Sequence, residues 1–156
     1  MREGQLTSDQ ATKLESVAER FDLRLIVLFG SRATGRAPVQ ESDVDIAFSG
    51  RRKIEWPERF ELMDALSEAL DLHDDRLDLV EVTQASGLLL RHICRDGIVL
   101  YQARCSERSE LCAYALRKYM DEARLRQSCE AYVRRRFGGQ ATSQSPATTQ
   151  SDSAEL

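Results

Sequence analysis

A mostly apolar run, LRLIVLF at 23–29, stops abruptly at Gly30 and Ser31, and a second apolar run, DVDIAF, begins with Asp43 and Asp45. Short runs of branched and apolar residues are typical of β-strands. Alternate side chains of a strand share one face, so the two aspartates point to the same side, about 6 to 7 Å apart, while the apolar residues between and after them point into a core. The chain must therefore fold with two like charges together on a half-buried strand.

This pair of carboxylates predicts a divalent cation, because neighbouring negative charges repel each other unless a cation lies between them. Asp78 lies between two leucines in a third apolar run, RLDLVEV at 76–82. If that strand lies beside the second one, Asp78 completes a cluster of three carboxylates. Ligands that are all oxygen suit Mg²⁺ or Mn²⁺, which bind carboxylates together with substrate phosphates. The predicted substrate is therefore a nucleoside triphosphate.

The turn after the first strand has the residues of a phosphate-binding loop. Gly30 allows a close backbone approach, Ser31 supplies a hydroxyl group, and backbone N–H groups at such a turn bind phosphate oxygens. Arg32 and Arg36 lie in the same loop, where they can neutralise the outer phosphates. The loop has neither the Gly-Lys-Ser/Thr ending of a P-loop nor the GxGxxG pattern of a dinucleotide-binding turn.

None of these features indicates a catalytic site on its own. The two aspartates of an isolated Asp-x-Asp are usually solvated surface charges, and a Gly-Ser pair follows many strands. Their conjunction and order along the chain are what indicate a catalytic site. The two histidines, His73 and His92, predict no ligand site, since a lone histidine in a helix is more often a surface or packed residue.

Helical segments alternate with these strands. Thr7 and Gln10 have the spacing of a capping box, Pro57 suits the first turn of a helix, and Gly97 suits a C-terminal stop. The predicted helices are 8–21, 57–72, 84–96 and a long one, broken or continuous, at about 107–136, and the predicted strands are 23–29, 43–49, 76–82 and 98–101. Residues 31–42 are predicted to form a loop with at most one helical turn. The buried side of the second helix is predicted to consist of Phe60, Met63, Leu66 and Leu70. This order predicts an α/β or α+β fold, a small mixed sheet with helices packed against it.

Length and composition suit one soluble globular domain, since the chain has 156 residues, 42% of them apolar and 31% charged. We expect that domain at 1–137, with a core at 21–101 and a C-terminal helical segment at 107–136. The polar residues 138–156 are predicted to form a disordered tail. No apolar run is long enough to span a membrane, the N-terminus is too polar for a signal peptide, and the four cysteines are expected to be reduced thiols, so the predicted location is the cytoplasm.

The net charge of −4 is unevenly distributed, because the first two thirds of the chain are acidic and the last predicted helix is basic. The acidic first two thirds of the chain argue against a broad nucleic-acid-binding surface, because such a surface must be basic, so no nucleic-acid template is expected. The basic helix is compatible with a homo-oligomer or a hetero-oligomer, and the sequence does not choose between them.

The segments GSRATG, SDVDIAF and DLVEV, followed by QASGLLLRHICRDGIVLY, resemble the DNA polymerase beta-like nucleotidyltransferase superfamily. The resemblance covers about 21–101 and is greatest to the minimal nucleotidyltransferases (MNT), small proteins often paired with a HEPN-domain toxin. It implies that Asp43 and Asp45 hold metal ions and that Gly30 and Ser31 hold the triphosphate of ATP. Asp78 would share a metal and help to deprotonate the acceptor hydroxyl for in-line attack on the α-phosphorus. The eleven residues between Ser31 and Asp43 are one more than is usual in the family.

The leading interpretation is a metal-dependent enzyme that transfers AMP from ATP to a hydroxyl group of a partner protein, as the antitoxin of a HEPN/MNT pair. A second interpretation is adenylylation of a small molecule, as in antibiotic nucleotidyltransferases, which generally carry a further helical domain. A third is a non-catalytic antitoxin that neutralises its partner by binding alone. The presence of all three carboxylates favours the first two.

Overall fold

The structure is a computed structural model, and it describes residues 6–35, 43–72 and 77–137. Arg36 and the predicted disordered tail lie outside the described residues. The chain divides into two units, 1–121 and 122–156. The prediction of one domain at 1–137 therefore stays a prediction.

Helices and strands alternate along the first unit as the sequence predicts. Its elements are α1 Ser8–Arg20, β1 Leu23–Phe29, α2 Gly30–Thr34, β2 Val44–Gly50, α3 Trp56–Ala69, β3 Leu77–Glu81, α4 Gly87–Asp96, β4 Ile98–Gln102 and α5 Glu107–Asp121. In the second unit, the described residues contain α6, Ala123–Phe137. The long helix predicted at 107–136 is thus two helices, and a short helix occupies the start of the predicted loop at 31–42.

The four strands form one sheet in the order β3-β2-β1-β4. β1 runs antiparallel to both β2 and β4, whereas β2 and β3 are parallel. Parallel neighbours require a crossover connection, and α3 provides it between β2 and β3. The predicted mixed sheet is confirmed.

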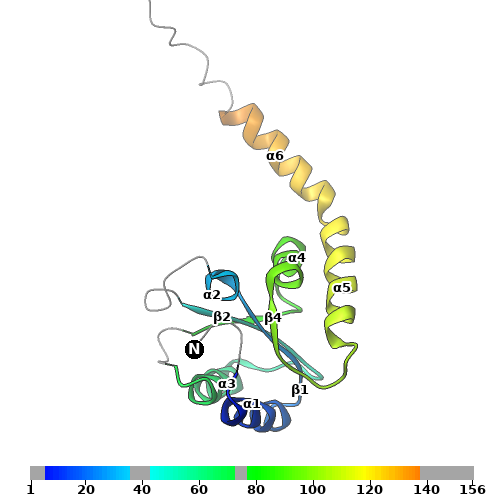
Figure 1. Cartoon of the computed structure of the whole chain (residues 1–156). Coiled ribbons are helices and arrows are strands. Elements are labelled where there is room, and N and C mark those ends of the chain that lie inside the picture. The colour runs from blue at the N-terminus through cyan, green and yellow to red at the C-terminus, as the bar shows by residue number, and fades with distance from the viewer. Residues whose placement is uncertain (1–5, 36–42, 73–76, 138–156) are drawn as a thin grey trace, which may run out of the picture. The chain divides into compact units, whose positions relative to one another are not determined.

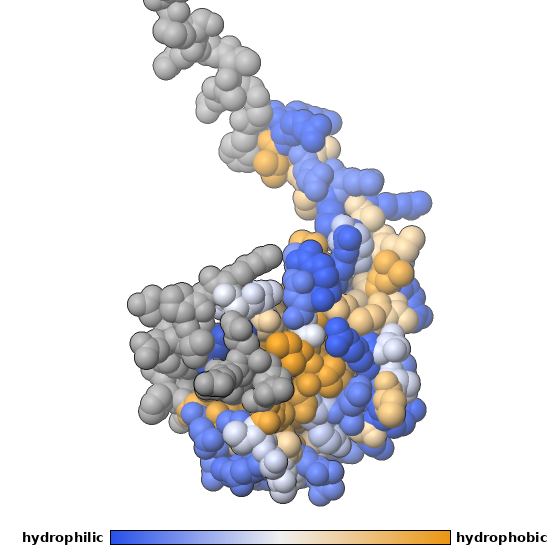
Figure 2. All heavy atoms as spheres, viewed as in Figure 1, coloured by the Kyte–Doolittle hydropathy of each residue, from blue (hydrophilic) through white to orange (hydrophobic). Residues whose placement is uncertain are grey.

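Helices cover both faces of the sheet and create two apolar cores (Figure 1). On one face, α1 and α3 pack against side chains such as Ile26 and Ile46. On the other face, α4 and α5 pack against side chains such as Val27 and Ala47. Figure 2 shows mostly hydrophilic atoms at the bottom of the view, where α1 and α3 lie, and apolar atoms at its centre, where the residues of β4 are only partly buried.

Gln10 ties the start of α1 to the end of α3. The predicted capping box is confirmed, because Gln10 N donates to Thr7 Oγ1 at 3.2 Å and Thr7 N donates to Gln10 Oε1 at 3.1 Å. The Gln10 amide nitrogen also donates to the carbonyl oxygen of Leu70 at 3.3 Å. One buried polar side chain thus satisfies backbone groups at two helix ends.

The prediction for the buried side of α3 is correct for Leu66 and Leu70 but wrong for Phe60, whose side chain is 56% exposed. At about 100° per residue, Phe60 lies about 120° around the helix from Leu66, outside the buried stripe. Its ring instead contacts the exposed Trp56, with the ring centroids 6.0 Å apart.

The predicted boundaries of α3 and α4 are also corrected. α3 ends at Ala69 rather than at residue 72, and α4 begins at Gly87 rather than at residue 84. The later start of α4 has a clear cause, because the Ser86 hydroxyl accepts a hydrogen bond from Leu89 N at 3.2 Å and so acts as the N-cap.

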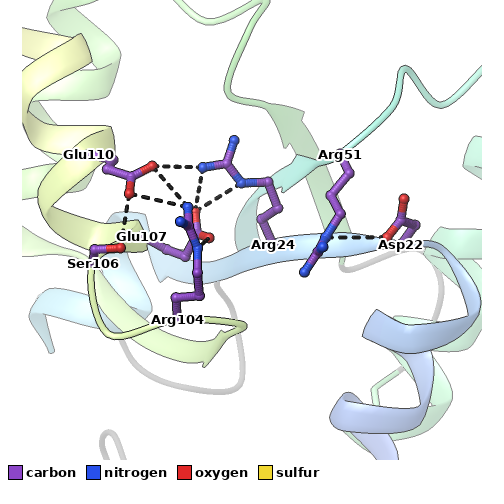
Figure 3. Close-up of polar contacts among 7 residues, drawn as sticks. All are labelled: Asp22, Arg24, Arg51, Arg104, Ser106, Glu107 and Glu110. Atoms are coloured by element: carbon purple, nitrogen blue, oxygen red, sulfur yellow. Dashed lines mark hydrogen bonds and ion pairs between the residues drawn. The ribbon is translucent and has the colours of Figure 1, made fainter.

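A cluster of ion pairs fixes the start of α5 against β1 (Figure 3). Glu107 is only 4% exposed, and its carboxylate accepts hydrogen bonds from Arg24 Nη2 at 2.7 Å and Arg104 Nε at 2.9 Å. Glu110 accepts from the same two arginines, but its side chain is 46% exposed. Burial acts to raise the pKa of Glu107, but the hydrogen bonds from Arg24 and Arg104 outweigh it and lower the pKa from the ordinary value of 4.5.

Replacing Glu107 by Gln should lower the free energy of unfolding by about 1.5 to 3 kcal/mol at pH 7, because the hydrogen bonds from Arg24 and Arg104 lose their negatively charged acceptor at a buried site. The folded-state pKa of Glu107 is depressed, so its contribution is present above the unfolded-state pKa and is lost as pH falls through the folded-state pKa. The difference from wild type should therefore shrink in acid. Urea unfolding at several pH values measures this.

Glu110→Gln is the matched control for this experiment, because Glu110 shares both arginines yet is largely solvated. Its cost should be about 1 kcal/mol or less. Equal costs for the two substitutions would contradict the assignment of Glu107 as the anchoring carboxylate.

Candidate active site

The register of β2 and β3 brings two of the three predicted carboxylates together. Asp45 is paired directly with Asp78 in the parallel ladder. Residues paired in this way point to the same face of a sheet, so Asp78 is turned toward the other aspartates. Asp45 is half-buried, whereas Asp78 is exposed on an edge strand and Asp43 is exposed just before β2.

Val44, Ile46 and Phe48 point into the core as predicted, with at most 1% of each side chain exposed.

The three carboxylates act on one another electrostatically. The pKa of Asp45 lies above its ordinary value, first because burial disfavours the charged form and then because of the negative charges of Asp78 and Asp43. In the described part of the chain, no three His, Cys, Asp or Glu side chains form a ready-made metal-binding group. The donor set is nevertheless all oxygen and combines three negative charges, which fits a hard divalent cation such as Mg²⁺ or Mn²⁺.

Gly30 lies directly against the Asp45 carboxylate. Its φ is +74°, and a Cβ atom built on it would lie 2.0 Å from Asp45 Oδ2. The position therefore requires glycine for two reasons, the left-handed backbone and the close approach of a carboxylate. Because Phe29 pairs with Asp45 in the antiparallel register, the end of β1 and the start of β2 form one continuous site.

Ser31 and Arg32 lie in the short helix α2, where the sequence predicts at most one helical turn. α2 begins at Gly30 without a side-chain cap and ends at Gly35, whose φ is +64° and whose N–H donates to Ser31 O. The hydroxyl of Thr34 donates to the carbonyl oxygens of Gly30 and Ser31 at 3.2 and 3.3 Å. The structure thus brings Gly30 to the Asp45 carboxylate and places Ser31 and Arg32 next to it in α2, whereas Arg36 lies outside the described residues.

A cleft of about 410 Å³ adjoins this site between α2 and α4. Its lining residues are Phe29, Gly30, Ser31, Thr34, Leu89, His92, Arg95 and Asp96. No pattern in the sequence points to His92 and Arg95 of α4 as site residues, because their nearness to Ser31 depends on tertiary packing between helices about 60 residues apart. The sequence analysis predicts no site at His92.

A mixed sheet that carries three neighbouring carboxylates beside a Gly-Ser turn is suited to transfer of a nucleotidyl group. The sequence model of the family described as "Polymerase beta, Nucleotidyltransferase" matches residues 12–105, more than half of the chain. The chain belongs to this family.

Relatives with names and solved structures support the same assignment. The chain is 30% identical over 86 residues to the protein adenylyltransferase MntA of Aphanizomenon flos-aquae (strain 2012/KM1/D3), a match that covers 51% of this chain and 57% of that protein. The chain thus spans little more than half the length of this relative.

Two solved structures share the fold. A chain from the crystal structure of a toxin-antitoxin with AMP-PNP has a TM-score of 0.65 and 26% identity, over 79% of this chain and 97% of that one. A chain from the tri-AMPylated HEPN toxin of Shewanella oneidensis in complex with MNT antitoxin has a TM-score of 0.60 and 25% identity, over 80% and 95%. Across the described ranges of this chain, no helix has the length and apolar character needed to cross a membrane.

Replacing Gly30 by Ala should destabilise the fold by about 1 to 2 kcal/mol from the left-handed backbone alone, and further through the contact with Asp45. Because of this contact, the effects of Gly30→Ala and Asp45→Ala on the free energy of unfolding should be coupled by about 1 kcal/mol. Gly30→Ala should therefore lower the free energy of unfolding less in the Asp45→Ala variant than in wild type. Urea unfolding of the two single variants and the double variant measures it.

Gly35→Ala is the control, because Gly35 has a similar positive φ at the other end of α2. Its cost should be the same with and without Asp45. If the cost of Gly30→Ala is also independent of Asp45, the close approach of the carboxylate has no energetic role.

Proposed function

We propose that this protein transfers AMP from ATP to a hydroxyl group of a partner protein, and that the partner is a HEPN-type toxin which this modification neutralises. The observation that carries the proposal is the pairing of Asp45 with Asp78 beside Gly30. Membership of the nucleotidyltransferase family supports the reaction class. The names of the relatives, a protein adenylyltransferase and complexes that contain AMP-PNP or an AMPylated HEPN toxin, support ATP and the partner.

In this proposal Asp43, Asp45 and Asp78 hold Mg²⁺ or Mn²⁺, and the ion supplies positive charge that stabilises the reacting phosphate. Gly30 and Ser31 bind phosphate oxygens through backbone N–H groups and a hydroxyl, and Arg32 and Arg36 neutralise the outer phosphates. Phosphoryl-type transfer of this kind depends mainly on positioning and electrostatics, which these groups provide.

The reaction exchanges one phosphorus–oxygen bond for another. The acceptor oxygen forms a bond to the α-phosphorus, the bond from the α-phosphorus to pyrophosphate breaks, and the hydroxyl proton passes toward the Asp78 carboxylate. Asp78 suits this role because it is exposed on the edge strand β3, where a folded protein acceptor can reach it.

The same proposal assigns residues 1–137 to one catalytic domain and the protein to the cytoplasm. The cytoplasmic assignment is supported by the four cysteines, all free and so suited to a reducing compartment.

Replacing Asp45 by Asn should lower transfer of labelled AMP to the partner by about 10²- to 10³-fold, because a charged ligand at the reacting centre is lost. The assay incubates the protein with α-³²P-ATP, Mg²⁺ and a HEPN-type toxin as the candidate partner. Asp64→Asn, an exposed aspartate on α3, is the matched control and should leave transfer unchanged.

The other two interpretations give different results in this assay. If the Asp45→Asn protein still neutralises the toxin in cells, neutralisation is by binding alone. If label passes to aminoglycosides or other small hydroxyl compounds and not to the partner, the acceptor is a small molecule. Either result contradicts the proposed function.

A divalent cation should stabilise the wild-type protein and not the Asp78→Asn variant. Binding to the native state alone adds about 1.4 kcal/mol to the free energy of unfolding when the ion is at ten times its Kd. The measurement is a thermal or urea unfolding titration with Mn²⁺ at constant ionic strength, with Asp64→Asn as the control. Equal stabilisation of all three proteins would contradict a metal site that contains Asp78.

A further inference from the structure

The cleft between α2 and α4 lies on the same face of the sheet as the carboxylates. Phe29 forms part of its wall, and this residue is both the register partner of Asp45 and a member of the core beneath α4 and α5. Gly30, which forms another part of the wall, lies against the Asp45 carboxylate. A ligand whose reacting atom is at Asp45 can therefore extend into the cleft past Ser31.

The α4 side of the cleft carries a chain of hydrogen bonds that orients one imidazole ring. Arg95 Nε and Nη2 donate to the two oxygens of Asp96 at 2.9 and 2.6 Å, and Arg95 Nη2 lies 3.1 Å from His92 Nδ1. A guanidinium group can only donate, so Nδ1 of His92 accepts. The ring proton is then on Nε2, and His92 is held as an N–H donor.

The direction of the cleft matches the geometry of the reaction. In an in-line displacement the leaving group departs on the side opposite to the attacking oxygen. In the sheet order β3-β2-β1-β4, Asp78 lies on β3, whereas the cleft lies on the other side of Asp45, at the end of β1 and beneath α4. An acceptor that approaches Asp78 thus directs the leaving group toward the cleft.

From these observations we infer that the cleft between α2 and α4 binds the β- and γ-phosphates of the nucleoside triphosphate, and pyrophosphate after transfer, through His92 and Arg95. This inference rests on the proposed function. His92 Nε2 donates to a phosphate oxygen, and Arg95, whose bonds to Asp96 and His92 leave from Nε and Nη2, offers Nη1. Asp96 holds Arg95 in place and offsets part of its charge, so that pyrophosphate is bound but can leave.

His92→Ala should raise the KM for ATP and the inhibition constant for pyrophosphate by about 10-fold, the value expected for loss of a hydrogen bond to a charged group. Binding of AMP, which lacks the β- and γ-phosphates, should change by less than twofold. Arg95→Ala should act in the same way. The measurements are transfer kinetics with pyrophosphate as product inhibitor and equilibrium binding of AMP to the full chain.

Arg91→Ala is the matched control, because it also removes one cation from α4, but its guanidinium lies over the Tyr119 ring, 4.9 Å from the centroid. It should leave the pyrophosphate inhibition constant unchanged. His92→Gln keeps an N–H donor and should recover part of the affinity. It also keeps the test valid if His92→Ala folds poorly.

Four outcomes of these measurements are distinguished. Weaker inhibition by pyrophosphate in the His92 and Arg95 variants, with Arg91→Ala unaffected, supports the inference. Unchanged inhibition overturns it, as does a change in preference between ATP and GTP without a change in pyrophosphate inhibition, because the cleft would then hold the base. A wild-type protein that transfers no nucleotide overturns the proposed function itself, whatever the variants do.

Discussion

The parallel register of β2 and β3 is the constraint on which the site depends. A shift of one residue would turn Asp45 or Asp78 into the core and an apolar neighbour out of it. Burying an apolar side chain stabilises the fold by about 1.5 to 3 kcal/mol. Five apolar side chains of the two strands are buried on the face opposite the carboxylates: Val44, Ile46, Phe48, Leu77 and Leu79. Two unit charges 4 Å apart repel by about 4 kcal/mol near a protein surface. The core therefore dominates, and the carboxylates are held together despite their repulsion.

Much of this arrangement could be predicted from the sequence, because the period of two in a strand is a local property. The alternation in DVDIAF is sufficient to place Asp43 and Asp45 on one face and Val44, Ile46 and Phe48 on the other. Strand order is not a local property, so the position of Asp78 beside Asp45 could only be stated as a condition. The error at Phe60 has a related cause, since apolar residues at the margin of a helical stripe can join the core or lie on the surface.

Two contacts of the site could not be predicted from the sequence. The first is that of Gly30 with Asp45, which depends on how β1 ends beside β2. Because glycine commonly follows a strand, its presence there does not indicate a contact with a carboxylate. The position of His92 and Arg95 beside Ser31 depends on the packing of α2 against α4. The segment that contains them contributes to the resemblance to the family, but no residue spacing within it indicates a ligand.

On the proposed function, the edge position of β3 gives the nucleotide and the acceptor separate routes to the carboxylates. Nothing in the described sheet pairs with the outer side of β3, and Asp78 is exposed there, whereas Asp45 is half-buried against Gly30. On the proposed assignment, the nucleotide lies along α2 and the acceptor approaches from β3. A protein acceptor can then dock over β3 without displacing the nucleotide. The difference in exposure between the two paired aspartates thus leaves Asp78 open to the acceptor, while Asp45 lies on the nucleotide side against Gly30.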